Sequence, residues 1–260
     1  MADNRVVLFL VDGMRPDAMM LAKTPHMDRI MANGQFTLKA KTVMPSVTLP
    51  THMSLFHSVK PDRHNTLTNT FAPQARPIPG MMELVHADEQ VTAMFYNWEQ
   101  LRDLSRPGSL DASMYFRIGD ASIGESDLEV TQQALSWLTQ NDCNLTFIYL
   151  GQTDEVGHNH GWMSAEYLEA IQLADACIGQ VMGILGENVY YMVTADHGGH
   201  NRMHGTPNKT DMTIPFLMCG PKIKNLGKLK QKVSIIDIAP TIMKILKIKP
   251  PKKWRGNSLL

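Results

Sequence analysis

Four side chains that bind metals in many proteins lie close together in one glycine-rich segment, "TADHGGHNRMHGT", which runs from Thr194 to Thr206. These four are Asp196, His197, His200 and His204. Carboxylate and imidazole groups are common ligands of zinc and of related divalent ions. The glycines allow the irregular backbone that two adjacent ligands need in order to face one ion. The segment therefore predicts part of a metal site.

Acids also follow two other apolar segments, which the sequence pattern predicts to be strands. Asp12 follows "VVLFLV", Asp154 follows "TFIYLGQT", and Asp196 follows "YYMVTA". Ligands of open α/β sheets bind outside the carboxyl ends of the strands, so we expect these acids to meet at one edge. Three carboxylates there would repel one another unless a cation neutralised them. His158 lies four residues after Asp154, so both side chains could face the same ion.

The expected ligand set mixes oxygen and nitrogen atoms, which favours zinc, with manganese as the second choice. Its members are Asp12, Asp154, His158, Asp196, His197 and His204. Six ligands exceed what one catalytic zinc needs, so we expect two ions per chain. Two ions about 4 Å apart form a clamp suited to displacement reactions at phosphorus.

A hydroxyl nucleophile is available in "MPSVTLPTHMSL", which offers Ser46, Thr48, Thr51 and Ser54. Thr48 comes just before a helix that should begin around Pro50. Its oxygen would lie at the positive end of the helix dipole and could ligate one zinc ion, which would favour the alkoxide. The alternative to a catalytic role is that Thr48 is only the N-cap residue of this helix.

Strand and helix patterns alternate along the whole chain, which predicts an α/β fold. We expect a three-layer αβα sandwich with a mainly parallel central sheet. In "SDLEVTQQALSWLTQ", Ser126 and Glu129 have the spacing of a capping box. We expect a single catalytic domain over residues 1–260, with a small excursion or cap around residues 66–80.

Composition excludes several classes of function. Basic and acidic residues are equal at 25 each, so nothing suggests binding to a nucleic-acid polymer. The segment from Lys222 to Arg255 is locally basic, which could help to attract an anionic substrate. The three cysteines match no metal or redox motif, and we identify no signal peptide or transmembrane segment, so a cytoplasmic location is expected. The oligomeric state stays open.

The motifs together resemble the alkaline phosphatase superfamily, and within it the type I phosphodiesterase/nucleotide pyrophosphatase branch, as a short bacterial-type member. The resemblance rests on "LFLVDGMRPD", "MPSVTLPTHMSLFHSVKPDRH", "YLGQTDEVGHNHG", "TADHGGHNRMHGT" and "MTIPFLMCGP". It implies one zinc ion held by Asp154, His158 and His204, and another held by Asp12, Thr48, Asp196 and His197. It also implies Thr48 as the nucleophile and Asn69 as a donor to a phosphoryl oxygen. His200 competes with His204 as the last ligand.

The resemblance implies a hydrolase that cleaves phosphodiester or pyrophosphate bonds of a small, nucleotide-like substrate through a phospho-threonine. A phosphomonoesterase or a phosphonate hydrolase could use the same metals and nucleophile. A monoesterase would need a further cation, for which Arg15, Arg202 and Lys209 are candidates. A diesterase would need an apolar wall, for which the candidates are Phe71, Tyr96 and Trp98. The sulfatase signature is absent, and the chain leaves little room for the inserted domain of the mutases. A catalytically silent metal-binding protein is the alternative from another class.

Overall fold

The computed structural model describes residues 4–117, 122–223 and 226–260, and its centre is one sheet. The strands are β1 (Val6–Val11), β2 (Gln35–Lys41), β3 (Thr92–Tyr96), β4 (Ala112–Tyr115), β5 (Leu145–Leu150), β6 (Tyr190–Thr194), β7 (Thr213–Cys219) and β8 (Gly227–Lys228). Their order across the sheet is β4-β3-β5-β1-β6-β7-β2-β8. Among the strands of the described residues, only β7 runs antiparallel to its neighbours, so the sheet is mixed and mostly parallel, as expected.

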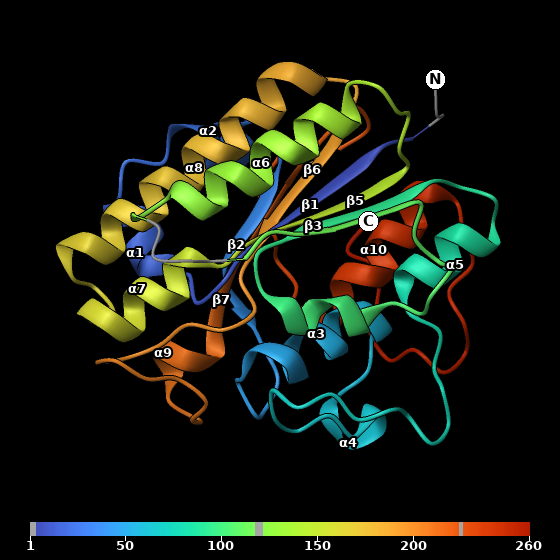
Figure 1. The fold of residues 1–260 in the computed structure, drawn as a ribbon, viewed down its shortest axis with the longest axis horizontal. Helices are drawn as coiled ribbons and strands as arrows, with labels where there is room; N and C mark the ends of the chain where they lie inside the picture. Colours follow the sequence, from blue (N-terminus) through green and yellow to red (C-terminus); the bar gives the residue numbers. More distant parts are fainter. Residues whose placement is uncertain (1–3, 118–121, 224–225) are drawn as a thin grey trace.

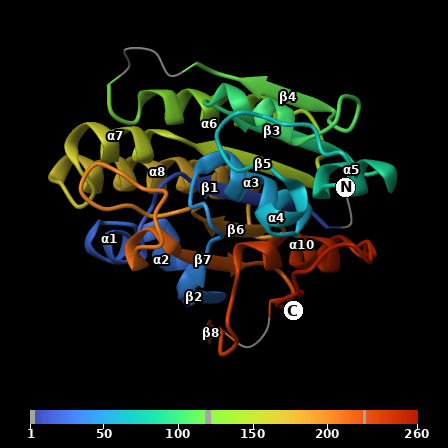
Figure 2. The same ribbon diagram turned by 90° about the horizontal axis from the view of Figure 1, so that it is seen from below.

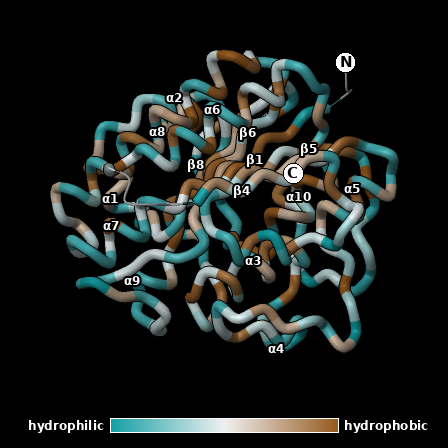
Figure 3. The backbone as a smooth tube through the Cα atoms, viewed as in Figure 1, coloured by the Kyte–Doolittle hydropathy of each residue, from teal (hydrophilic) through white to brown (hydrophobic). Residues whose placement is uncertain are grey.

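The central strands form where the sequence is continuously apolar and β-branched. Every residue of β1, β5 and β6 is buried, because helices cover both faces of the sheet at this point. Figure 3 shows hydrophobic segments concentrated along these central strands and hydrophilic segments mostly at the periphery. A core of this kind fixes the strand ends that carry the candidate site.

Helices form a layer on each side of the sheet (Figures 1 and 2). One layer contains α1 (Pro16–Leu21), α2 (Pro25–Ala32), α6 (Glu125–Leu138), α7 (Gln152–His160) and α8 (Ala165–Leu185). The other contains α3 (Thr48–His57), α5 (Met81–Ala87) and α10 (Ile238–Leu246). The short elements are α4 (Pro61–His64), α9 (Lys209–Met212) and the 3-10 helices η1 (Glu99–Leu104) and η2 (Ile235–Asp237). The expected αβα sandwich is confirmed.

Helix α8 is the one described helix that is long and apolar enough to cross a membrane. It packs instead on α6, α7 and β1, and its buried side chains include Tyr167, Ile171 and Ile178. Its apolar character is therefore accounted for by its place in the core.

Two local predictions were wrong. The residue that caps α6 is Gly124, with φ of +87°, and Ser126 lies inside the first turn. The Ser126 hydroxyl accepts a hydrogen bond from the Asn97 side chain instead of capping the helix. The helix expected to begin around Pro50 starts earlier, because Thr48 is the first residue of α3 and Val47 is its N-cap, so the alternative role of Thr48 as an N-cap does not apply.

Candidate metal centre

The candidate site lies at the carboxyl ends of β1, β5 and β6, which are adjacent strands. Asp12 directly follows β1, and Asp196 comes two residues after β6. Asp154 lies further from its strand than the sequence suggested, in the first turn of α7. This position puts His158 one helical turn after Asp154, so their side chains lie on the same face of the helix.

The expected ligand atoms form two overlapping clusters. One consists of Asp154, His158 and His204, and the other of Asp12, Asp154 and His197. Asp154 belongs to both: its Oδ2 lies 3.4 Å from Nε2 of His158, and its Oδ1 lies 3.7 Å from Nε2 of His204. The two clusters therefore share one carboxylate.

Asp196 faces the second cluster. Its Oδ2 lies 3.3 Å from Nε2 of His197, and Oδ1 of Asp12 lies at the same distance from that nitrogen. The other oxygen of Asp196 accepts hydrogen bonds from the backbone N–H groups of Gly13 and His197. These bonds fix the carboxylate, leaving Oδ2 directed toward the cluster.

Backbone carbonyls orient the three histidines. Nδ1 of His158 lies 3.0 Å from the carbonyl of Arg202, and Nδ1 of His204 lies 2.9 Å from that of Ser46. Nδ1 of His197 lies 2.8 Å from the Gly198 carbonyl. Because a carbonyl only accepts, each Nδ1 carries a proton, and Nε2 is the ring nitrogen that faces the cluster and is available to bind a metal. Metal-binding histidines are commonly oriented in this way.

Two carboxylate oxygens of the clusters accept no hydrogen bond from the described residues, which is consistent with atoms that bind a cation. Oδ1 of Asp12 and Oδ1 of Asp154 are both buried without a hydrogen-bond partner. Burial, together with the neighbouring carboxylates Asp196 and Asp154, raises the pKa of Asp12 well above its ordinary value. Buried acceptors with no donor are costly, and a divalent ion would supply the missing charge and the missing partner.

Thr48 lies beside the second cluster, at the amino end of α3. Its Oγ1 is 3.3 Å from Nε2 of His197, and the residue is 4% exposed. Asn69 reaches the same helix end, where its Oδ1 accepts a hydrogen bond of 3.0 Å from the Leu49 backbone N–H. The excursion that supplies Asn69 has no helix or strand between α4 and α5.

A cavity of about 510 Å³ opens over these groups. Its lining includes Thr48, Asn69 and residues of both clusters, and also Trp98, Tyr115 and Arg117. Tyr96 is not part of this wall, because it is buried in β3, and Phe71 lines a different cavity. Of the three aromatic residues expected to form a wall, only Trp98 lines it. Tyr115 and Arg117 were missed because "SMYFR" carries no motif.

Arg15, Arg202 and Lys209 were the candidates for the further cation that a monoesterase would need. Arg15 pairs with Asp17 at 2.6 Å and donates to the Gly199 carbonyl. Arg202 reaches the site with its carbonyl oxygen, which accepts from Nδ1 of His158. Neither arginine nor Lys209 lines the cavity over Thr48, whereas Arg117 does.

His200 lies in the same loop but outside both clusters. Its Nδ1 is 2.7 Å from Oδ1 of the buried Asp211. Asp211 also accepts from the backbone N–H and the hydroxyl of Thr206, so it ties both ends of the loop together. The geometry thus brings His204, not His200, into contact with Asp154.

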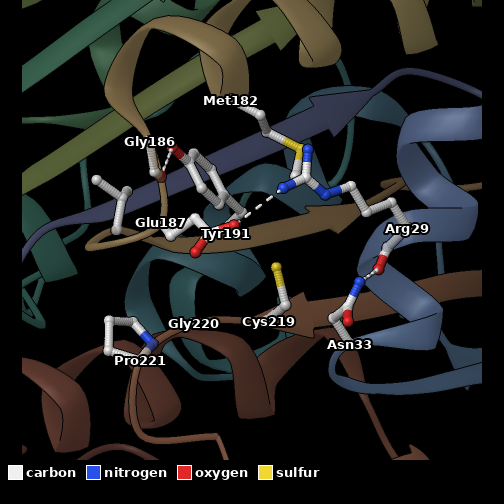
Figure 4. Close-up of a pocket in the computed structure, with 10 residues that line it drawn as sticks. Arg29, Asn33, Met182, Gly186, Glu187, Tyr191, Cys219, Gly220 and Pro221 are labelled. Carbon is white, nitrogen blue, oxygen red and sulfur yellow. Dashed lines mark hydrogen bonds and ion pairs between the residues drawn. The ribbon is translucent and has the colours of Figure 1, made fainter.

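A second cavity, of about 500 Å³, lies at the opposite end of the sheet (Figure 4). It is lined by residues that include Arg29, Glu187, Tyr191 and Cys219. The charges of Arg29 and Glu187 pair with each other at 3.3 Å, and the Tyr191 hydroxyl donates to the Gly186 carbonyl. None of the metal-ligand clusters found among the described residues lies there.

A family model, the metalloenzyme superfamily, matches residues 4–250. Curated relatives include 2,3-bisphosphoglycerate-independent phosphoglycerate mutases. That of Onion yellows phytoplasma is 26% identical over 99% of this chain and 52% of its own length. That of Clostridium kluyveri is 32% identical over 51% of this chain and 26% of its own length. The chain thus spans about half or less of the curated relatives that it matches.

Solved structures show the same fold. BT1596, a 2-O GAG sulfatase, has a TM-score of 0.82 at 13% identity and covers 99% of this chain and 73% of its own. Inactive murine ectonucleotide pyrophosphatase/phosphodiesterase 5 in complex with AMP has a TM-score of 0.78 at 16% identity, over 98% of this chain and 97% of its own. The phosphonate monoester hydrolase of Silicibacter pomeroyi has a TM-score of 0.77 at 14% identity, over 98% of this chain and 76% of its own. The match to the metalloenzyme superfamily model confirms the expected likeness to the alkaline phosphatase superfamily, and these solved structures share the fold.

Proposed function

Because this chain belongs to the metalloenzyme superfamily, we propose that it is a metal-dependent hydrolase of phosphodiester or pyrophosphate bonds. One observation carries the proposal. The Thr48 hydroxyl, at the first position of α3, lies 3.3 Å from Nε2 of His197, beside two clusters of metal-ligand atoms that share Asp154. This is the arrangement that an activated hydroxyl nucleophile requires.

We assign one divalent ion to Asp154, His158 and His204, and the other to Asp12, Thr48, Asp196 and His197. Zinc suits this mixed set of ligands best, and manganese is the second choice. When bound, the ions would neutralise the buried carboxylates, stabilise the Thr48 alkoxide and offset charge on the phosphoryl oxygens.

Thr48 and Asn69 have separate roles in the proposed reaction. Thr48 gives up its hydroxyl proton to solvent, its Oγ1 forms a bond to phosphorus, and the leaving oxygen departs with its bonding electrons and takes up a proton. Water then attacks the phospho-threonine: its oxygen stays on the released phosphoryl group, one of its protons restores the Thr48 hydroxyl, and the other passes to solvent. Asn69, held by the Leu49 N–H, directs its amide nitrogen toward a phosphoryl oxygen.

The cavity lining supports a diester or pyrophosphate substrate. Trp98 and Tyr115 provide an aromatic wall for a second substituent, and Arg117 is the arginine that lines the cavity. A nucleotide-like molecule, which carries both a ring and an anionic group, fits this lining. A monoester or phosphonate would use the same ions and Thr48 but would not need the wall.

Transfer of the phosphoryl group to a second hydroxyl is the other candidate, because the curated relatives are mutases. It would proceed through the same phospho-threonine, with an alcohol in place of water. The two candidates therefore differ only in the acceptor.

The test compares bis-p-nitrophenyl phosphate with p-nitrophenyl phosphate on metal-loaded protein, with a chelated control. We expect faster diester cleavage that the chelator abolishes, and release of the phosphoryl group to water even when glycerol is present.

Thr48→Ala should lower the rate on the order of 10³-fold or more, whereas Thr48→Ser and the exposed Thr70→Ala should retain activity. Full activity in Thr48→Ala would refute the nucleophile. Faster monoester cleavage would refute the diester assignment, and transfer to glycerol would favour the mutase-type reaction. Bound metal without turnover of either ester would indicate a silent metal-binding protein.

A further inference from the structure

Trp162, in the loop between α7 and α8, contacts three segments that carry ligands of the candidate metal centre. The residue is 6% exposed. Its indole Nε1 donates a hydrogen bond of 2.9 Å to the carbonyl of Gly13, which adjoins Asp12. Its backbone N–H donates a hydrogen bond of 2.7 Å to the carbonyl of Asn201, within the loop that bears His197 and His204. Trp162 therefore connects the end of β1 with that loop.

The indole ring also packs against two glycines that lie in segments carrying metal ligands. A Cβ atom placed on Gly157 would lie 2.8 Å from the ring, and one on Gly199 would lie 2.3 Å from it. Both distances are shorter than carbon atoms tolerate, so glycine at these positions allows the ring to lie flat against both segments. Gly157 precedes the ligand His158, and Gly199 follows His197 by two residues.

The indole ring also lies next to the two imidazoles of the first cluster. The ring centroid of Trp162 lies 5.1 Å from that of His158, in an edge-to-face arrangement, and 6.0 Å from that of His204. The indole thus supports the side of both imidazoles, while their Nδ1 atoms are held by backbone carbonyls.

Gly13 is the point at which Trp162 reaches the second cluster. Gly13 has φ of +66°, a conformation that favours glycine. Its carbonyl accepts from Trp162 and also from the Tyr167 hydroxyl, at 2.7 Å, and its N–H donates to Asp196. A residue that fixes Gly13 therefore fixes the backbone beside Asp12 and a hydrogen bond to Asp196.

We propose that Trp162 is a positioning residue that holds the two ligand clusters at their mutual spacing before any ion binds. This inference rests on the metal sites of the proposed function and adds the reason why they are preformed. The ligands come from distant parts of the chain, and Trp162 contacts the segments that carry them on three sides. Loss of support behind metal ligands typically weakens metal affinity by about 10 to 100-fold.

The experiment compares Trp162→Phe with Trp254→Phe. Trp254 is a matched control, because it is also 6% exposed and its Nε1 also donates at 2.9 Å to a carbonyl, that of Pro79, outside both clusters. Chelator-treated protein is titrated with Zn²⁺ by calorimetry, and the melting temperature of each metal-free variant is measured. Both variants should melt earlier than the wild type, since each loses buried contacts. Only Trp162→Phe should weaken Zn²⁺ binding, by about 10 to 100-fold.

A second variant keeps the test decisive if Trp162→Phe does not fold. Gly157→Ala retains the indole but places a methyl group against it, and it should weaken Zn²⁺ binding in the same direction. Equal Zn²⁺ affinity in Trp162→Phe, Gly157→Ala and Trp254→Phe would overturn the positioning role. A wild-type protein that binds no Zn²⁺ would overturn both this inference and the metal assignment. Tight Zn²⁺ binding that Trp162→Phe weakens, without hydrolysis of any phosphoester, would refute only the proposed reaction.

Discussion

Asp127 is an acid in the first turn of α6 whose burial makes the stability of the protein depend on pH. It is 1% exposed. Its Oδ1 accepts hydrogen bonds from the Asn97 side chain at 2.7 Å and from the Gln152 backbone at 3.3 Å. Burial raises the pKa of Asp127 from 3.8 to about 7, although these hydrogen bonds act in the opposite direction. The folded state therefore binds a proton at Asp127 more tightly than the unfolded state does.

The sign follows from this difference in proton binding. Between the unfolded pKa of 3.8 and the folded pKa of about 7, the folded state carries the extra proton, so the unfolding free energy falls as pH rises. The whole effect is about 4 kcal/mol, at about 1.4 kcal/mol for each pKa unit. Of this, about 2 to 3 kcal/mol falls between about pH 5 and about pH 8.

The assay is urea unfolding of chelator-treated protein at these two pH values, for the wild type and for Asp127→Asn. The amide retains an oxygen that accepts the same bonds but does not titrate. We expect the wild type to lose about 2 to 3 kcal/mol more than Asp127→Asn on going to the higher pH. Glu125→Gln is the control, because Glu125 lies in the same turn but is exposed, and the pKa of its carboxyl is lowered by Ser122. Equal pH dependence in the wild type and Asp127→Asn would refute the reasoning.

Two further predictions concern the metal ligands. His204→Ala should lower the bound zinc from two ions to one, measured by elemental analysis. His200→Ala should retain both ions, because His200 pairs with Asp211. A loss of zinc confined to His200→Ala would show that His200, not His204, is the ligand. Removal of both metal ions by a chelator should lower the melting temperature by roughly 10 to 20 °C, because each ion present at about 100 times its Kd contributes about 2.7 kcal/mol. An unchanged melting temperature would show that the native chain is not stabilised by divalent ions.

The strands and the acids at their ends could be predicted because both depend on local sequence. The continuous apolar runs of β1 and β5 are buried on both faces, and Asp12 follows β1 directly. The direction of β7 could not be predicted, because an apolar run looks the same in either orientation. The short strand β4 has an alternating burial pattern over only four residues, too few to stand out.

The candidate site also combines features that the local sequence predicts with features that it does not. The spacing of Asp154 and His158 predicts a shared face, and both lie in one cluster. The roles of Tyr115, Arg117 and Trp162 depend on which segments meet in space, and the neighbouring sequence says nothing about that. Ser126 has the sequence signature of a cap, but the positive φ of Gly124 starts the helix earlier.

The long separation of the ligands along the chain has a consequence for how the protein matures. Asp196 accepts a hydrogen bond from the backbone N–H of Gly13, 183 positions earlier. Contacts of such long range form late in folding, because closing a long loop costs entropy before any contact is made. During synthesis, Asp154 and His158 are added to the chain before His204. An emerging chain can therefore offer an ion only part of a coordination sphere, and tight metal capture must wait until the sheet has closed.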